Sequence, residues 1–197
     1  SSKPSGELGL KAMASYGNQN SWRLRTVVDL PQFGPLALKF SYLHDESHGW
    51  GRNLIGGQTI DLSLREPSFG KLTYADHLGY KNVNAFQAAA RLDFGDDILI
   101  DYHFDYTDSK TTAGPVQVLG HNGDLKGITE LIFDLQPLYG GITNQSIAPL
   151  SAVANATSVQ HMTVEGHNLT LSWDVSDNLS LKSITGYRRF KQKPNAH

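Results

Sequence analysis

Apolar and polar side chains alternate with a period of two through residues 97–108, DILIDYHFDYTD. In an extended chain, successive side chains point to opposite faces. One face of this segment would therefore carry Ile98, Ile100, Tyr102, Phe104 and Tyr106, and the other would carry Leu99, Asp101, His103 and Asp105. A helix would scatter the same residues around its circumference. The pattern predicts a strand with one aromatic face and one charged face.

The same alternation recurs in six other segments of the chain. They are residues 6–17, 21–30, 36–43, 84–94, 167–175 and 179–190. In the last of them Ile184 and Tyr187 would point to opposite faces of a regular strand. A bulge near residues 183–186 would place both on the apolar face. Together the segments predict an all-β fold, an antiparallel up-and-down meander of about seven strands.

The connections between the predicted strands differ in length according to the end of the sheet at which they lie. Turns join the strands at 17–20, 31–35, 95–96 and 176–178, whereas long loops occupy about 44–83 and 109–162. In a meander both long loops fall at the same end. Short turns at one end and long loops at the other are typical of an outer-membrane β-barrel. A soluble meander has no physical reason to sort its loops in this way.

The apolar face must contact either a protein core or lipid. Aromatic residues lie toward the ends of the predicted strands on this face, as the interfacial girdles of a membrane barrel do. On the reverse face, charged residues would line a wet lumen. The periodicity fits equally well a soluble sandwich or barrel whose core takes the same apolar residues.

Composition narrows these alternatives only in part. The 197 residues are 39 % hydrophobic with a mean hydropathy of −0.34, which suits a soluble protein and also a barrel in which only alternate residues face lipid. The apolar runs are too short for a transmembrane helix. A net charge of −2 offers no electrostatic case for nucleic acid. The chain has no cysteine, which excludes disulfides and cysteine metal sites.

No motif in the sequence points to catalysis or to a bound cofactor. His44 and His48 are four residues apart, but they straddle a predicted strand end and a glycine-rich loop, so the helical geometry of a shared metal is not expected. Asp101, His103 and Asp105 would lie in line along one strand, and no nucleophile motif accompanies them. We expect no enzyme activity, no metal site and no cofactor.

Three stretches of the sequence resemble consecutive segments from the first third of the barrel of TonB-dependent outer-membrane receptors. They are GELGLKAMASYGNQNSWRLRTVVDLP (6–31), LALKFSYLHDESHGWGRNL (36–54) and HNLTLSWDVSDNLSLKSITGYR (167–188). The opening KPSGE resembles the junction at which the plug of that family ends and its barrel begins. Residues 1–5 would then be a plug-to-barrel linker, and residues 6–197 would be part of the barrel.

The resemblance implies a barrel of about 22 strands around an N-terminal plug in the outer membrane of a Gram-negative bacterium. Members of this family import ferric siderophores, cobalamin, haem or sugars with energy passed through TonB. The chain departs from the family pattern because it carries no plug, no TonB-contacting segment, no signal peptide and no C-terminal aromatic strand. Since seven strands cannot close a barrel of that size, we expect a fragment. Its implied partners are outer-membrane lipid, its own plug, TonB and a small-molecule or metal-chelate substrate.

Two groups of residues are candidates for a functional role. In the first long loop, Trp50, Arg52, Tyr74 and His77 would contact ligand, because amphipathic aromatic and cationic side chains suit binding sites. On the polar face, Arg23, Arg25, Arg91 and Asp101 would pair with the plug or with neighbours in the lumen. Alternatively, the loop residues would only pack within the loop, and the polar-face residues would only be solvated. A second function remains open: a soluble or secreted β-sheet module that binds a ligand such as a carbohydrate.

Overall fold

The computed structural model describes residues 3–61, 63, 70–95, 97–115, 152–153 and 157–194. The chain divides into two compact units. The sheet unit comprises Ser1–Glu46, Asn82–Ser109 and Met162–Gln192, and the loop unit comprises Ser47–Lys81, Lys110–His161 and Lys193–His197. None of the described residues belongs to a helix that is long and apolar enough to cross a membrane.

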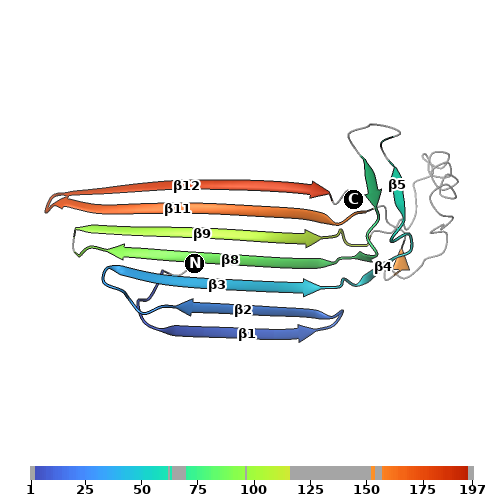
Figure 1. The fold of residues 1–197 in the computed structure, drawn as a ribbon, viewed down its shortest axis with the longest axis horizontal. Helices are drawn as coiled ribbons and strands as arrows, with labels where there is room; N and C mark the ends of the chain where they lie inside the picture. The colour runs from blue at the N-terminus through green and yellow to red at the C-terminus, as the bar shows by residue number, and fades with distance from the viewer. Residues whose placement is uncertain are drawn as a thin grey trace, which may run out of the picture. The chain divides into compact units, whose positions relative to one another are not determined.

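Seven antiparallel strands, adjacent in sequence order, form the large sheet (Figure 1). They are β1 (Gly9–Gly17), β2 (Ser21–Asp29), β3 (Leu36–Ser47), β8 (Lys81–Asp93), β9 (Ile98–Thr111), β11 (Gln160–Ser176) and β12 (Leu179–Pro194). This confirms the predicted seven-stranded antiparallel meander. Strands β3, β8, β9 and β11 run further than predicted, into the segments 44–83 and 109–162. The extra residues of β3 and β9 are polar, and those of β8 and β11 contain few apolar residues, so the alternation is weak there.

The register of the first strands assigns residues to the two faces, because directly opposed residues share a face. Tyr16 lies opposite Trp22, and Trp22 lies opposite Glu46. The turn between β1 and β2 contains Gln19 and Asn20 with φ of 57° and 49°. A positive φ at consecutive residues gives a turn whose twist matches that of the flanking strands.

Strand β12 keeps its alternation throughout. The Tyr187 ring lies 6.0 Å from the His167 ring on one face, and Arg188 pairs with Asp105 on the other. Lys182 lines a depression on the same face as Arg188, six residues earlier. The bulge suggested for residues 183–186 is therefore not needed, and Ile184 lies on the polar face, where it is exposed.

The loop unit contains short strands that sequence periodicity does not predict. Strands β4 (Gly51–Asn53), β7 (His77–Leu78) and β10 (Ala152–Val153) form one small sheet, and β5 (Thr59–Asp61) pairs with β6 (Lys71–Thr73). Most of the predicted loop 109–162, namely residues 116–151 and 154–156, lies outside the described residues. In β5 the Asp61 carboxylate accepts hydrogen bonds from the Ser63 hydroxyl and backbone N–H, which lowers the pKa of Asp61.

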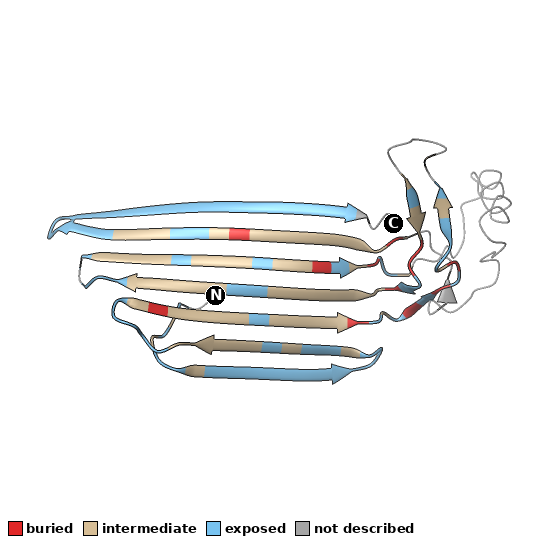
Figure 2. Cartoon of the chain, viewed as in Figure 1, coloured by how far each residue is buried: buried red, intermediate tan, exposed pale blue. Residues whose placement is uncertain are grey.

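Buried apolar side chains are concentrated in the loop unit. Among the described residues they are Ala37, Ile55, Tyr74, Ala75 and Leu78, of which only Ala37 belongs to the large sheet. The strands of the sheet are intermediate or exposed along most of their length (Figure 2). Within the sheet unit, no described helix or second sheet lies over either face, so the large sheet has no packed core of its own.

Candidate functional site

One face of the large sheet, here called the apolar face, carries a continuous row of rings. Phe40 and Phe86 lie 6.3 Å apart, Phe86 and Phe104 6.2 Å, Phe104 and His167 5.1 Å, and His167 and Tyr187 6.0 Å. The row crosses five neighbouring strands, from β3 to β12. Such ring pairs contribute roughly 0.5–1.5 kcal/mol each beyond the area that they bury.

Charged residues occupy only one end of the apolar face. Along β9 this face is uncharged from Ile98 to Tyr106, and Asp108 follows; along β12 it is uncharged from Leu179 to Tyr187, and Arg189 follows. Nine residues of strand span about 27 Å at roughly 3.4 Å per residue. The uncharged residues therefore form a band, here called the uncharged band, of similar length along both strands.

Polar side chains at the charged end of this band hydrogen-bond to one another. His44 lies with Nδ1 2.8 Å from Asn84 Oδ1 and Nε2 3.3 Å from Glu46 Oε2, and Trp22 Nε1 donates to the same Glu46 oxygen at 3.2 Å. Trp22 and His44 thus carry their polar ends next to the charged end of the face. At the middle of the band on β9, the Tyr102 hydroxyl lies 2.7 Å from His167 Nδ1, so these two polar groups pair with each other.

The opposite face, here called the polar face, carries ion pairs between neighbouring strands. Arg23 pairs with Asp45, which lies directly opposite it, and Lys39 Nζ lies 3.2 Å from Asp29 Oδ2, again directly opposite. Each pair therefore follows from the register of the strands.

Two strands further along the sheet, Arg91 makes a bidentate pair with Asp101 at 2.7 and 2.9 Å. Bidentate geometry makes this the strongest type of arginine–carboxylate contact.

A glycine permits an ion pair between two strands of the polar face that are not adjacent. Arg188 of β12 reaches Asp105 of β9 at 3.0 Å, although β11 lies between the two strands. The residue of β11 beneath this pair is Gly166, where a methyl group would lie 2.9 Å from Asp105 Cγ. The missing side chain leaves the space through which the carboxylate and the guanidinium meet.

The segment before β1 also lies on the polar face. Lys3 Nζ is 3.5 Å from Asp101 Oδ2, the Ser5 N–H donates to Asp29 Oδ1 at 3.1 Å, and the Gly6 carbonyl accepts from Gln32 N–H at 2.8 Å. Residues 3–5 of the predicted linker belong to no strand, and residues 1–2 lie outside the described residues. The polar face therefore already holds a stretch of polypeptide.

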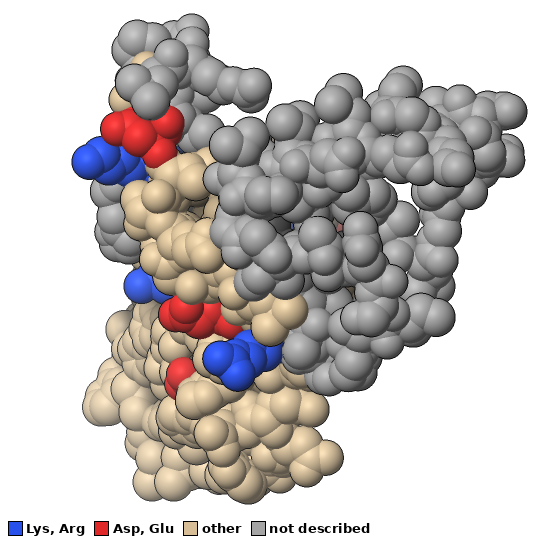
Figure 3. All heavy atoms as spheres, turned by 90° about the vertical axis from the view of Figure 1, so that its right-hand side faces the viewer, with Lys and Arg blue, Asp and Glu red and all other residues tan. Residues whose placement is uncertain are grey.

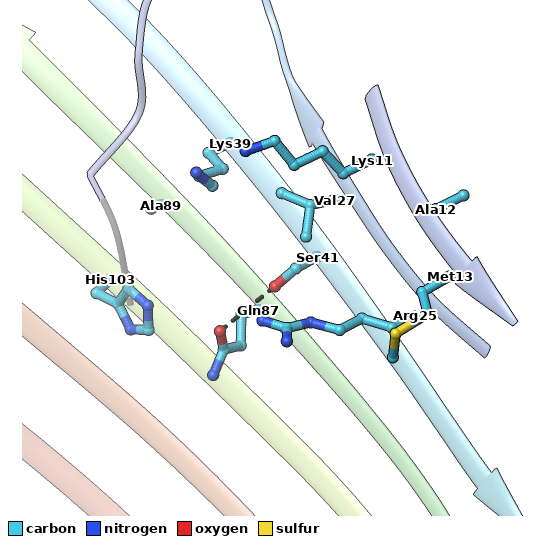
Figure 4. Close-up of a pocket in the computed structure, with 10 residues that line it drawn as sticks. All are labelled: Lys11, Ala12, Met13, Arg25, Val27, Lys39, Ser41, Gln87, Ala89 and His103. Carbon is cyan, nitrogen blue, oxygen red and sulfur yellow. Dashed lines mark hydrogen bonds between the residues drawn. The ribbon is translucent and has the colours of Figure 1, made fainter. Parts of the chain in front are cut away.

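A depression of about 360 Å³ opens in the polar face (Figure 4). Its lining comes from β1, β2, β3, β8 and β9 and consists of Lys11, Ala12, Met13, Arg25, Val27, Lys39, Ser41, Gln87, Ala89 and His103. The Ser41 hydroxyl donates to Gln87 Oε1 at 3.3 Å. The lining contains three cationic side chains and no carboxylate.

The structure separates the four predicted polar-face residues into two kinds. Arg23, Arg91 and Asp101 pair with neighbours in the sheet, whereas Arg25 lines the depression and has no ion-pair partner among the described residues. Register explains the difference. Arg23 lies opposite Asp45, but Arg25 lies opposite Met13 on one side and Leu43 on the other.

The four predicted loop residues belong to the loop unit, and the structure brings two of them together. Arg52 and His77 are directly opposed on β4 and β7, and both are exposed. Trp50 is 48 % exposed and packs against Gly79, where a Cβ would lie 3.0 Å from Trp50 Nε1. Tyr74 is only 4 % exposed, so in this structure it packs within the loop unit. Ligand contact by these residues stays a prediction.

Charges of both signs lie close together on the face that Figure 3 presents. There, lysine and arginine side chains lie beside aspartate and glutamate side chains in small groups, so the described part of this face has no large patch of one sign. The described residues also contain no group of three or more His, Cys, Asp or Glu side chains placed to hold a metal ion.

Several structurally important residues were not predicted as site residues. Lys11 joins Arg25 in the depression, Gly166 makes room for an ion pair, and Asn53 holds the loop unit together through hydrogen bonds. Alternation already places Lys11 on the polar face. Only the strand register shows that neither it nor Arg25 faces a carboxylate.

No protein-family model matches the chain, and no curated protein or solved structure matches it either.

Proposed function

We propose that the sheet unit crosses a bacterial outer membrane as a sector of a larger β-barrel, and that the protein is a receptor of the TonB-dependent kind that imports a scarce nutrient. The uncharged band is the observation that carries this proposal. It spans nine residues, about 27 Å of chain, on β9 and on β12. A tilted transmembrane β-strand needs about 9–11 residues, and outer-membrane barrels border their apolar band with aromatic residues.

The exposure of the apolar face supports lipid as its neighbour. Phe86 and Tyr102 belong to the interior of the sheet, yet each is 38 % exposed, and Trp173 is 42 % exposed. The apolar patches of soluble monomers rarely exceed about 300–600 Å². A face of seven strands lined with rings needs a non-aqueous neighbour, and lipid fits both the length of the uncharged band and the charges at its end.

The polar face suits the lumen of such a barrel. Charged residues that pair across strands remain stable where water reaches them, and such residues are abundant on this face. Within the described chain, β1 and β12 each have one neighbouring strand. We propose that further strands continue the sheet at both edges toward about 22 in total, around a plug that TonB acts on.

The loop unit would capture the substrate. Its exposed residues Trp50, Arg52 and His77 offer an aromatic ring and two polar or cationic groups, which suits a ferric siderophore, cobalamin or a sugar. The work is transport, in which no covalent bond is made or broken.

A soluble or secreted ligand-binding module, for example one for carbohydrate, is the second candidate. The depression on the polar face and the exposed loop residues fit this module as well as they fit the receptor. This alternative requires a protein layer over the apolar face, and the sheet unit contains none among its described residues.

The three tryptophans of the chain allow a direct test. Trp22 and Trp173 lie on the apolar face, whereas Trp50 lies in the loop unit and serves as the matched control. Three single-tryptophan variants of the intact protein, made by Trp→Phe changes, would be reconstituted in vesicles of brominated phosphatidylcholine. We expect strong fluorescence quenching of Trp22 and Trp173 and little of Trp50. Equal, weak quenching of all three, in variants with unchanged circular dichroism, would refute membrane insertion.

A further inference from the structure

The depression on the polar face brings two uncompensated cations together. Arg25 is directly opposite Met13, so Lys11, two residues from Met13, lies diagonal to Arg25 on the same face of the sheet. Diagonal neighbours of this kind are about 7–8 Å apart at their Cα atoms, within reach of long side chains. Among the described residues, neither Lys11 nor Arg25 has a carboxylate partner.

This arrangement differs from the rest of the polar face. Arg23, Arg91 and Arg188 each meet a carboxylate, and Lys39 meets Asp29. Lys11 and Arg25 therefore lack the carboxylate that compensates these four cations, and an anion in the depression would supply it.

The surroundings of the two cations provide further hydrogen-bond donors. In Figure 4 the side chains of Lys11 and Arg25 extend in the same direction away from β1, with Val27 between them. Beyond them lies the Ser41–Gln87 pair, in which Gln87 accepts through Oε1 and so keeps its amide N–H groups as donors. Lys39 and His103 also line the depression. Ammonium, guanidinium and amide N–H groups are the donors that oxyanions attract.

We propose that this depression is an oxyanion-binding site, in which Lys11 and Arg25 together bind a carboxylate or phosphate group. A volume of about 360 Å³ lies within the range of small-molecule sites, so it accommodates a small ligand that bears such a group. An acidic side chain of a polypeptide is the other source of the same chemistry, because this face already holds the segment around Lys3 and Ser5. The site goes beyond the proposed function, since it does not depend on what covers the apolar face.

Calorimetric titration of the intact protein tests the proposal. Citrate, inorganic phosphate and a hexaglutamate peptide serve as probes, and glucose serves as the neutral control. We expect saturable binding of at least one anionic probe, and Lys11→Gln and Arg25→Gln should each weaken it about tenfold or more, because each removes a charge-assisted hydrogen bond. Lys182→Gln, a cation on the same face outside this depression, is the matched control and should change binding less than about twofold.

Thermal unfolding gives a second readout, which distinguishes anion binding by Arg25 from a purely structural role of this residue. Without anion, Arg25→Gln should unfold at nearly the same temperature as the unsubstituted protein, because Arg25 has no ion-pair partner to lose among the described residues. The anionic probe that binds should raise the unfolding temperature of the unsubstituted protein more than that of Arg25→Gln.

The outcomes separate the two sources of the anion and the ways in which the proposal fails. Binding of citrate or phosphate assigns the site to a small molecule, and binding of hexaglutamate alone, with the same dependence on Arg25, assigns it to a polypeptide. The site does not exist if no anionic probe saturates, or if Lys182→Gln weakens binding as much as Arg25→Gln does. These results are independent of the brominated-lipid experiment, so failure of membrane insertion and failure of this site are distinguishable.

Discussion

At the scale of single residues, the face from which a side chain leaves its strand decides which medium surrounds it. Ile100 points to the apolar face, and its neighbour Leu99 points to the polar face beside Asp101. Two aliphatic side chains that are adjacent in sequence thus meet different surroundings. If the apolar face contacts lipid and the polar face a wet lumen, as we propose, the same substitution at the two positions should have different effects, because a charge is costly only in lipid.

Arginine substitution on β9 measures this difference. In the intact protein in lipid vesicles, Ile100→Arg should lower the free energy of unfolding by roughly 2–4 kcal/mol if residue 100 lies near the middle of the bilayer. Leu99→Arg makes the same chemical change on the polar face and should be nearly neutral. Urea unfolding gives the two values. Equal losses at Ile100 and Leu99 would indicate that protein covers both faces.

At the same scale, Asn53 links the segments of the loop unit. It is 4 % exposed, its Nδ2 donates to the Ala75 carbonyl at 2.7 Å, and its Oδ1 accepts from Ile55 N–H at 3.3 Å. Asn53→Ala leaves these buried groups without partners and should destabilise the loop unit by about 1–3 kcal/mol.

Hydrogen exchange checks the effect of Asn53→Ala. Exchange should become faster in residues 53–58 and 74–76, while β1 and β2 keep their protection. Arg52→Ala, at the exposed neighbouring position of the same strand, should leave the pattern unchanged. Unaltered exchange around Ala75 in Asn53→Ala would show that these hydrogen bonds do not hold the loop unit together.

At the scale of elements, Gly166 lets β9 and β12 interact over the strand that separates them. A methyl group at this position would displace the Asp105 carboxylate from Arg188. The pair is partly solvent-exposed, so its coupling energy should be roughly 0.2–1 kcal/mol.

A double-mutant cycle checks this crossing. We expect measurable coupling between Arg188→Gln and Asp105→Asn in the unsubstituted protein and none in the Gly166→Ala background. The Arg91–Asp101 pair provides the control, and its coupling should be the same in both backgrounds. Coupling between Arg188 and Asp105 that survives Gly166→Ala would mean that the glycine is not needed for the contact.

The long strands could be predicted from the sequence, and the short strands could not. The large-sheet strands were predictable because each is nine residues or longer, which shows the alternation several times. Strands β4 to β7 have two or three residues each, too few to display any period. They form through pairing with other segments, and the partner can be distant in sequence, as where Arg52 of β4 pairs with Ala152 of β10. The ends of β3 and β9 were missed because their last residues are polar.

At the scale of the whole molecule, the large sheet needs a neighbour for its apolar face. Without lipid or detergent, the intact protein should therefore self-associate through this face, because burial of apolar area is worth roughly 25 cal/mol per Å². Analytical ultracentrifugation should show large assemblies in plain buffer and a single detergent-bound species above the critical micelle concentration. A folded monomer in plain buffer would contradict the lipid-facing assignment and favour the soluble module.

Sequence by itself determined the period of two, and with it the seven strands, their meander and the residues that share each face. This follows from backbone geometry, because an extended chain alternates its side chains whatever surrounds it. Only the tertiary structure decided which charges pair. Pairing depends on register, and a register shift of one residue exchanges the faces of a whole strand. It is register that leaves Lys11 and Arg25 without a carboxylate while Arg23, two residues before Arg25, has Asp45.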